Sequence, residues 1–138
     1  MKRRGKYEPG GYVLHVRKST VGKGLFAGEA IPEGACIIEY VGPAISEVER
    51  YASRSKYLFE VTARKTIDGR PKWNKAGYIN HSCRANAASA VRRGRVFIMA
   101  LRDIRPGEEI AYDYGEEYFD SHIRPKGCRC VHCHGAAR

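Results

Sequence analysis

Short segments rich in Val, Ile, Tyr and Phe alternate with Gly and Pro along this chain, a pattern typical of strands separated by tight turns. The segments predicted as strands are 12–18, 24–27, 36–41, 58–63, 66–68, 87–91 and 95–100. Helical periodicity is sparse. The best candidate helix begins at Ser46, a suitable N-cap followed by Glu47 and Glu49, and runs to about Ser53. The pattern therefore predicts a mainly β protein.

Two turn sequences resemble each other, AIPEG at residues 30–34 and DIRPG at residues 103–107. Each leads into an Ile-containing segment that ends in tyrosine, at Tyr40 and Tyr112 respectively. Common turn chemistry explains the likeness, because tight turns need Gly and Pro in any case, so no duplication is inferred. The likeness predicts that Tyr40 and Tyr112 lie at comparable strand ends.

A length of 138 residues is enough for about one domain with a single core. The longest apolar run, residues 96–101, is far too short to cross a bilayer. Residues 1–6 are basic, as at the start of a signal peptide, but no apolar stretch follows them. We therefore expect an intracellular protein without a signal peptide.

Basic residues outnumber acidic ones by 25 to 15, giving a net charge of +10. This charge favours acidic partners and allows weak contact with nucleic acid through the basic surface. Most basic residues are scattered, and only residues 1–6 and 92–95 form clusters. An ordinary basic surface without a dedicated site is the alternative interpretation.

Four of the five cysteines lie in two motifs, which favours metal ligation over disulfides. The fifth, Cys36, lies in the apolar run ACII and is predicted to be a small core residue. Residues 128–133 read CRCVHC and offer three thiolates, and Cys83 can supply the fourth ligand of a tetrahedral structural zinc. Reduced cysteines without metal are the alternative, and His132 or His134 could replace one thiolate.

Four blocks in a fixed order carry a resemblance: GKG at 22–24, YINHSC at 78–83, EEIAYDYG at 108–115 and CRCVHC at 128–133. Together they resemble the SET-domain protein-lysine methyltransferases, over about residues 12 to 133. One departure is Ala85, where such families often carry proline. The resemblance implies the SET fold of small twisted β-sheets, with a C-terminal pseudoknot and a short zinc-stapled tail.

The resemblance also implies a division of the chain and a set of ligands. The polar, Gly-containing composition of residues 1–10 predicts a basic, loosely ordered arm, whereas the resemblance implies that residues 11–118 form the SET catalytic domain and residues 119–138 a post-SET zinc-binding tail. The implied cofactors are S-adenosylmethionine as co-substrate and one structural Zn²⁺. The residues implied to bind S-adenosylmethionine are Gly22, Lys23, Gly24, Tyr57, Asn80 and His81, and those implied to bind zinc are Cys83, Cys128, Cys130 and Cys133. Considered without the resemblance, Asn80 and His81 could equally be satisfied turn residues.

Tyrosine is frequent, with nine copies, and several fall within these motifs. Aromatic walls can hold the apolar stem of a lysine while hydroxyl groups orient its amine. The resemblance implies that Tyr114 is the catalytic tyrosine and that Tyr40 and Tyr112 line the lysine channel. Related enzymes carry Phe or Tyr at the position of Tyr112, and the hydroxyl is expected to favour monomethylation. Each tyrosine alone could instead be a half-buried strand residue.

The expected partner is a protein with a target lysine, such as a histone tail or another basic protein. Acidic residues near the motifs could form a rim for a basic peptide: Glu108, Glu109, Asp113, Glu116, Glu117 and Asp120. The expected location is the cytoplasm, the nucleus or chromatin, or a host cell into which the protein is delivered. A catalytically silent binding module and a zinc-stapled nucleic-acid-binding protein are the alternatives, and the intact Asn80, His81, Tyr112 and Tyr114 argue against the first.

Overall fold

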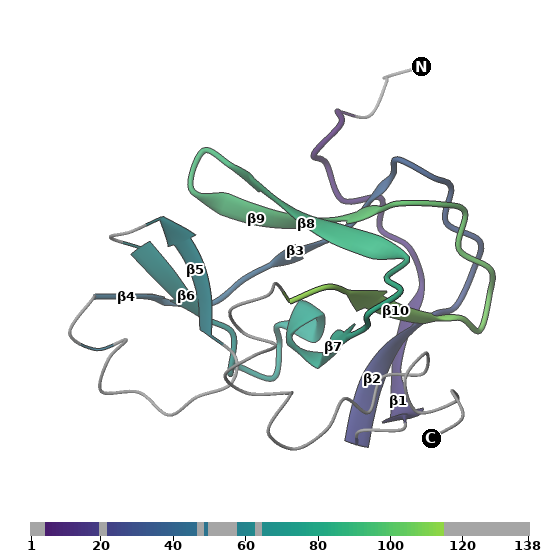
Figure 1. Ribbon diagram of the computed structural model, residues 1–138, viewed down its shortest axis with the longest axis horizontal. Helices are drawn as coiled ribbons and strands as arrows, with labels where there is room; N and C mark the ends of the chain where they lie inside the picture. The colour runs from purple at the N-terminus through teal and green to yellow at the C-terminus, as the bar shows by residue number, and fades with distance from the viewer. Residues whose placement is uncertain (1–4, 20–21, 47–48, 50–57, 63–64, 115–138) are drawn as a thin grey trace.

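The structure is a computed structural model that describes residues 5–19, 22–46, 49, 58–62 and 65–114. Within these residues the chain forms short strands and one 3-10 helix, so the mainly β class is confirmed (Figure 1). The larger sheet contains β1 Leu14–Ser19, β2 Gly22–Ala27, β3 Cys36–Tyr40, β7 Asn80–His81, β8 Ala87–Arg92, β9 Arg95–Ala100 and β10 Glu109–Tyr112. The smaller sheet contains β4 Ala44–Ile45, β5 Leu58–Thr62 and β6 Lys65–Asp68. The 3-10 helix η1 is Lys75–Tyr78.

The predicted strands are confirmed, with ends displaced by at most two residues. Tyr40 and Tyr112 are the last residues of β3 and β10, as the similar turns predict. The strands β4 and β7 were missed, because a pair of residues shows no alternating pattern. Ser46 caps as predicted: its hydroxyl accepts the Glu49 N–H, and the Glu49 carboxylate accepts the Ser46 N–H, both at 3.1 Å. Residues 47–48 and 50–53 of the expected helix lie outside the described residues.

The strand β10 occupies the middle of the larger sheet, whose order is β1-β2-β10-β8-β9-β3 (Figure 1). It runs antiparallel to β2 and parallel to both β7 and β8. The connection from β9 to β10 begins at the exposed Leu101. It then passes alongside the turn at residues 30–34. The late strand β10 thereby lies between β2, from the early part of the chain, and β8, from its middle part.

The two similar turns lie against each other in space. Ile31 and Ile104 form an antiparallel bridge, with N···O distances of 2.9 and 2.8 Å. Both isoleucines are 1% exposed, and each turn ends in a glycine with positive φ, 82° at Gly34 and 88° at Gly107. Positive φ is readily accessible to glycine, so the shared turn chemistry has a conformational cause.

One apolar cluster with residues from both sheets forms the core. Its most buried side chains are Leu25, Ile31, Ile37, Ile79, Val96, Ile98, Ile104 and Ile110. Cys36 is 3% exposed, which confirms the prediction of a core cysteine, and burial with the nearby Glu39 carboxylate raises its pKa to about 11. Among the described residues, no helix has the length and apolar character that crossing a membrane requires.

The N-terminal residues that the structure describes, 5–10, contact the sheet. The Gly10 N–H donates to the Cys36 carbonyl at 3.0 Å, and the Tyr7 ring packs on Phe97 with centroids 5.7 Å apart. These contacts differ from the loose arm that composition suggested, because composition does not reveal a ring packed on a distant strand. The remainder of the expected arm, residues 1–4, lies outside the described part.

Candidate active site

The parallel pairing of β7 with β10 brings together two of the motif blocks. Ala111 pairs with Asn80 and Tyr112 pairs with His81. The Ser82 N–H also donates to the Tyr112 carbonyl at 3.2 Å, which continues the pairing by one residue. Segments about thirty residues apart in sequence thus become neighbours through backbone hydrogen bonds.

The Asn80 carboxamide joins these strands to the glycine turn. Its Nδ2 lies 3.0 Å from the Lys23 carbonyl, 2.9 Å from the Glu109 carboxylate and 3.1 Å from the Ser19 hydroxyl. Two hydrogens are shared among three acceptors, so the amide is oriented toward the turn. The Glu109 carboxylate approaches the Gly24 backbone so closely that a Cβ added to Gly24 would lie 2.3 Å from it.

Gly22 has a φ of 101°, a conformation that favours glycine. The structure therefore brings together Gly22, Lys23, Gly24 and Asn80, four of the residues predicted to bind S-adenosylmethionine. Ser19 and Glu109 complete this cluster, and the sequence analysis assigned neither of them to it. Contacts across 57 to 61 residues leave no signal in a single sequence.

His81 is buried, with 9% of the residue exposed. Its Nδ1 accepts the Tyr114 N–H at 3.1 Å, so the ring proton of the neutral form belongs on Nε2, 3.4 Å from the Cys83 sulfur. Burial lowers the pKa of His81, and the Asp113 carboxylate 3.8 Å away opposes this effect. The ring is therefore a neutral group that fixes the backbone at Tyr114.

Tyr112 and Tyr114 pack on each other, with ring centroids 4.9 Å apart. Tyr114 also meets the His81 ring edge to face at 5.4 Å, and its hydroxyl donates to the Ile79 carbonyl. Tyr112 is 7% exposed and belongs to the main apolar cluster. Both predicted tyrosines of this block are thus held by ring contacts as well as by backbone pairing.

Tyr40 enters the same buried cluster from β3 and is 5% exposed. Its ring packs on Phe59 at 5.3 Å, and a Cβ added at Gly69 would lie 2.2 Å from its hydroxyl. The buried Asn74 fixes this region, because its side chain accepts the Val41 N–H at 3.1 Å and donates to the Gly69 carbonyl at 3.2 Å. Asn74 was not identified from the sequence.

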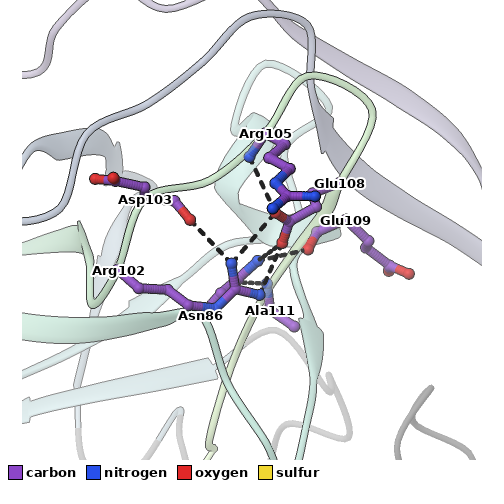
Figure 2. A network of polar contacts seen from close by, with 7 residues as sticks. All are labelled: Asn86, Arg102, Asp103, Arg105, Glu108, Glu109 and Ala111. Carbon is purple, nitrogen blue, oxygen red and sulfur yellow. Dashed lines mark hydrogen bonds and ion pairs between the residues drawn. The ribbon is translucent and has the colours of Figure 1, made fainter.

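A polar network at the start of β10 holds the strand in place (Figure 2). The Asn86 side chain is its centre: Oδ1 accepts the Ala111 N–H at 2.9 Å, and Nδ2 donates to the Glu109 carbonyl at 2.9 Å. Nδ2 also lies 3.3 Å from the Glu108 carboxylate. Asn86 is 4% exposed, so these bonds replace water that the buried amide would otherwise need.

The Glu108 carboxylate is bound on its other side by Arg102, with an N···O distance of 2.8 Å, and by the Arg105 N–H at 3.0 Å (Figure 2). The Arg102 guanidinium, together with the hydrogen bonds from Arg105 and Asn86, lowers the pKa of Glu108 to about 2 despite partial burial. Glu108 is engaged here and Glu109 is engaged with Asn80, so both acids contribute to the fold, and the acidic rim stays a prediction. Glu116, Glu117 and Asp120 lie outside the described residues.

Of the predicted zinc ligands, the structure describes only Cys83. Cys83 is exposed, directly after β7, whereas Cys128, Cys130, Cys133, His132 and His134 lie outside the described residues. Tyr57 also lies outside them. Within the described ranges, no group of three His, Cys, Asp or Glu side chains could hold a metal ion. The zinc site therefore stays a prediction.

Comparison with known proteins identifies a family to which the sequence is similar. The sequence profile of the SET domain matches residues 22–115. Histone-lysine N-methyltransferase trr of Drosophila melanogaster is 34% identical over 134 residues, which cover 88% of this chain and 6% of that protein. Histone-lysine N-methyltransferase ASHH3 of Arabidopsis thaliana is 35% identical, with 83% of this chain and 38% of that protein covered. Histone-lysine N-methyltransferase set1 of Dictyostelium discoideum is 37% identical over 123 residues, covering 80% of this chain and 8% of that protein.

The chain spans between 6% and 38% of the length of these relatives. The matched residues 22–115 include the glycine turn, the β7 segment and β10 with the tyrosines that follow. The part of the chain that the profile matches thus includes both the Asn80 bond to the Lys23 carbonyl and the Tyr114 bond to His81.

Proposed function

This chain belongs to the SET-domain family, and on that premise we propose that it is a protein-lysine N-methyltransferase that uses S-adenosylmethionine. The observation that carries the proposal is the meeting of the glycine turn, Asn80, His81 and the paired tyrosines around β10. This arrangement joins a polar turn with a carboxamide on one side to an aromatic, largely buried wall on the other. Such a combination suits a polar co-substrate that meets a long aliphatic side chain.

S-adenosylmethionine would be held by Gly22, Lys23, Gly24, Asn80 and His81, with Tyr57 contributing from outside the described residues. The fit is supported by Gly24, which has no room for a side chain, and by Asn80, whose amide already faces the turn. The bound co-substrate supplies an electrophilic methyl group on a sulfonium. A neutral His81 suits this neighbour, because a protonated ring would add a second positive charge.

In the proposed reaction, the lysine nitrogen forms a bond to the methyl carbon and the carbon–sulfur bond breaks. S-adenosylhomocysteine leaves and the amine gives up one proton to solvent. Free lysine has a pKa of about 10.4, so burial of the amine against Tyr40 and Tyr112 favours the neutral, nucleophilic form. Tyr114 is the proposed catalytic tyrosine, since His81 and the Ile79 carbonyl fix both ends of the residue.

The C-terminal tail completes the proposal. Cys83 lies two residues beyond β7, with its sulfur close to the His81 ring, and offers one thiolate. Cys128, Cys130 and Cys133 would supply the others to a structural zinc, with His132 or His134 as possible substitutes. A zinc at this place would tie residues 119–138 to the strand that carries Asn80, and residues 11–118 would form the catalytic domain with its C-terminal pseudoknot.

The proposed substrate is a lysine in a histone or another basic protein, and the proposed location is nuclear or chromatin-associated. Both rest on the relatives, which are named histone-lysine N-methyltransferases. The proposed product is mainly monomethyl-lysine, because the buried Tyr112 hydroxyl occupies space that a second methyl group would need.

The test is mass spectrometry of basic proteins, histones included, after incubation with zinc-loaded protein and labelled S-adenosylmethionine. Tyr114→Phe removes the fixed hydroxyl and is expected to abolish most of the label on lysine. Tyr12→Phe removes a hydroxyl outside the site and is the matched control, with label expected to persist. Label that survives Tyr114→Phe would contradict the proposed role, and absence of any binding of S-adenosylmethionine would favour a silent binding module.

A further inference from the structure

Two basic segments that lie far apart in sequence meet on one surface. The Tyr7 ring has the Lys6 Nζ 5.4 Å and the Arg92 guanidinium carbon 5.1 Å from its centroid. The ring itself packs on Phe97, 5.7 Å away, and Phe97 in turn lies under Arg95 at 5.1 Å. The aromatic pair thus forms a platform that holds basic side chains from both segments in fixed positions.

The β8–β9 hairpin ends in a strained, charged turn. Arg92 pairs with Arg95, so Arg93 and Gly94 form a two-residue loop, with φ values of 51° and 75°. Among the residues that the structure describes, Arg93 is the only non-glycine residue with positive φ. Asn, Asp or Gly fits this position without strain, whereas Arg is disfavoured there. The turn therefore carries a positive charge on a residue that adopts this backbone conformation less readily than Asn or Gly.

The second sheet adds another cation to the same place. Lys65, the first residue of β6, donates from Nζ to the Gly94 carbonyl at 2.8 Å. We call Lys6, Lys65, Arg92, Arg93 and Arg95 the hairpin patch. Two acids stand beside it: Glu39 pairs with Arg95 at 2.7 Å, and Glu8 accepts the Gly5 N–H at 3.1 Å. The hairpin patch therefore keeps an excess of positive charge.

We propose that the hairpin patch is a docking surface for the phosphate backbone of double-stranded nucleic acid. A duplex carries one negative charge per about 1.7 Å of its length, a density that matches several cations held on one hairpin tip. Base stacking on unpaired strands needs an open aromatic face. The Tyr7 ring is partly buried and already has Lys6, Arg92 and Phe97 as neighbours, so the patch suits a duplex rather than a single strand. This function is independent of methyl transfer.

The structure offers a variant that separates charge from folding. Arg93→Asn removes one cation and introduces a residue that accepts positive φ, so the stability of the hairpin is expected to be kept or raised. Arg105→Gln is the matched control: it makes the same change in net charge at an exposed site beyond the opposite end of β9. Arg92→Gln is a second variant inside the patch, away from the strained turn conformation.

The measurement is fluorescence anisotropy of the full chain with a labelled 20-base-pair DNA duplex over a series of NaCl concentrations. Loss of one phosphate contact is expected to lower the slope of log K against log salt by about 0.9 and to weaken binding about fivefold to tenfold at 0.1 M salt. We expect this for Arg93→Asn and for Arg92→Gln, with Arg105→Gln within about twofold of the wild type. Urea midpoints check that each variant is folded.

Several results would overturn the proposal. These are absence of binding at 50 mM salt, unchanged affinity of Arg93→Asn and Arg92→Gln, and an equal loss for Arg105→Gln, which would assign binding to net charge alone. Tighter binding of a single strand of the same length would favour an unpaired nucleic acid. Displacement of the duplex by polyglutamate at equal charge concentration would indicate an acidic protein instead.

Discussion

Replacing Asn86 by aspartate is expected to destabilise this protein strongly at neutral pH and less so in mild acid. The substitution keeps the shape of the side chain and the oxygen that accepts the Ala111 N–H. It replaces the Nδ2 donor by an oxygen that faces the Glu109 carbonyl and the Glu108 carboxylate, at 2.9 and 3.3 Å. The site is 4% exposed, so water cannot restore the lost bonds.

The magnitude follows from these contacts. A buried acceptor left without its donor costs about 1–3 kcal/mol, and the bond to a charged carboxylate lies at the upper end of that range. We therefore expect the free energy of unfolding to fall by about 2–4 kcal/mol at pH 7, a large part of the roughly 5–15 kcal/mol typical of a domain. Urea unfolding followed by circular dichroism measures this change.

The pH dependence identifies the cause. In the folded variant the new carboxyl faces oxygen atoms, so its pKa is raised above the unfolded value, and protonation restores a donor. The destabilisation should be complete above the folded pKa and shrink as the pH falls below it.

Asn86→Ala has no titratable group at this site and serves as the control. Its destabilisation relative to the wild type should stay constant between pH 7 and pH 4. Equal pH dependence in the two variants, or a loss under about 0.5 kcal/mol for the aspartate at pH 7, would refute the reasoning, because a surface substitution has effects of that size.

Four further outcomes are expected. Glu108→Gln should remove a contribution to the free energy of unfolding that depends on pH. Because the pKa of Glu108 is about 2 in the folded protein and 4.5 ordinarily, this contribution is fully present above pH 4.5 and is lost as the pH falls through 2. With Arg102 54% exposed, solvent screening reduces this to about 1–2 kcal/mol, measurable as converging urea midpoints of variant and wild type at low pH. Tyr112→Phe should shift the product toward di- and trimethyl-lysine, and a mass spectrum in which the wild type already yields mainly trimethyl-lysine would contradict the proposal. Gly24→Ala should displace the Glu109 carboxylate, which lies 2.3 Å from the added Cβ, and raise the Kd for S-adenosylmethionine in calorimetry about tenfold, whereas Glu109→Gln should have less effect. Chelation of zinc should lower both the affinity for S-adenosylmethionine and the Tm, and unchanged affinity after verified metal removal would count against the zinc-stapled tail.

The strands were predictable because their signal is local. Segments such as 36–41 and 95–100 carry apolar and β-branched residues between turn signals, and the structure starts β3 and β9 at the expected residues. The candidate site was predictable only as a set of motifs. Their order implied that Asn80, His81 and Tyr114 act together, and the structure bonds Asn80 to the glycine turn and His81 to Tyr114, while their shared role stays a prediction.

The polar partners were not predictable from the sequence. Glu108 and Glu109 read as an acidic rim, yet their neighbours are Arg102, Asn86 and Asn80, and the pairing depends on where β10 inserts. The packing of Tyr7 on Phe97 likewise joins residues 90 positions apart through the course of the chain around the sheet. Local propensity carries no record of such long-range contacts.

The central position of β10 has a consequence for the order in which this protein can fold during synthesis. β2 and β8 each hydrogen-bond to β10 and lie on opposite sides of it, so both present an open edge until residues 109–112 leave the ribosome. Exposed strand edges are templates for pairing with other chains. A product that stops before Glu109 would keep two such edges, and we expect it to aggregate rather than to form a smaller stable sheet.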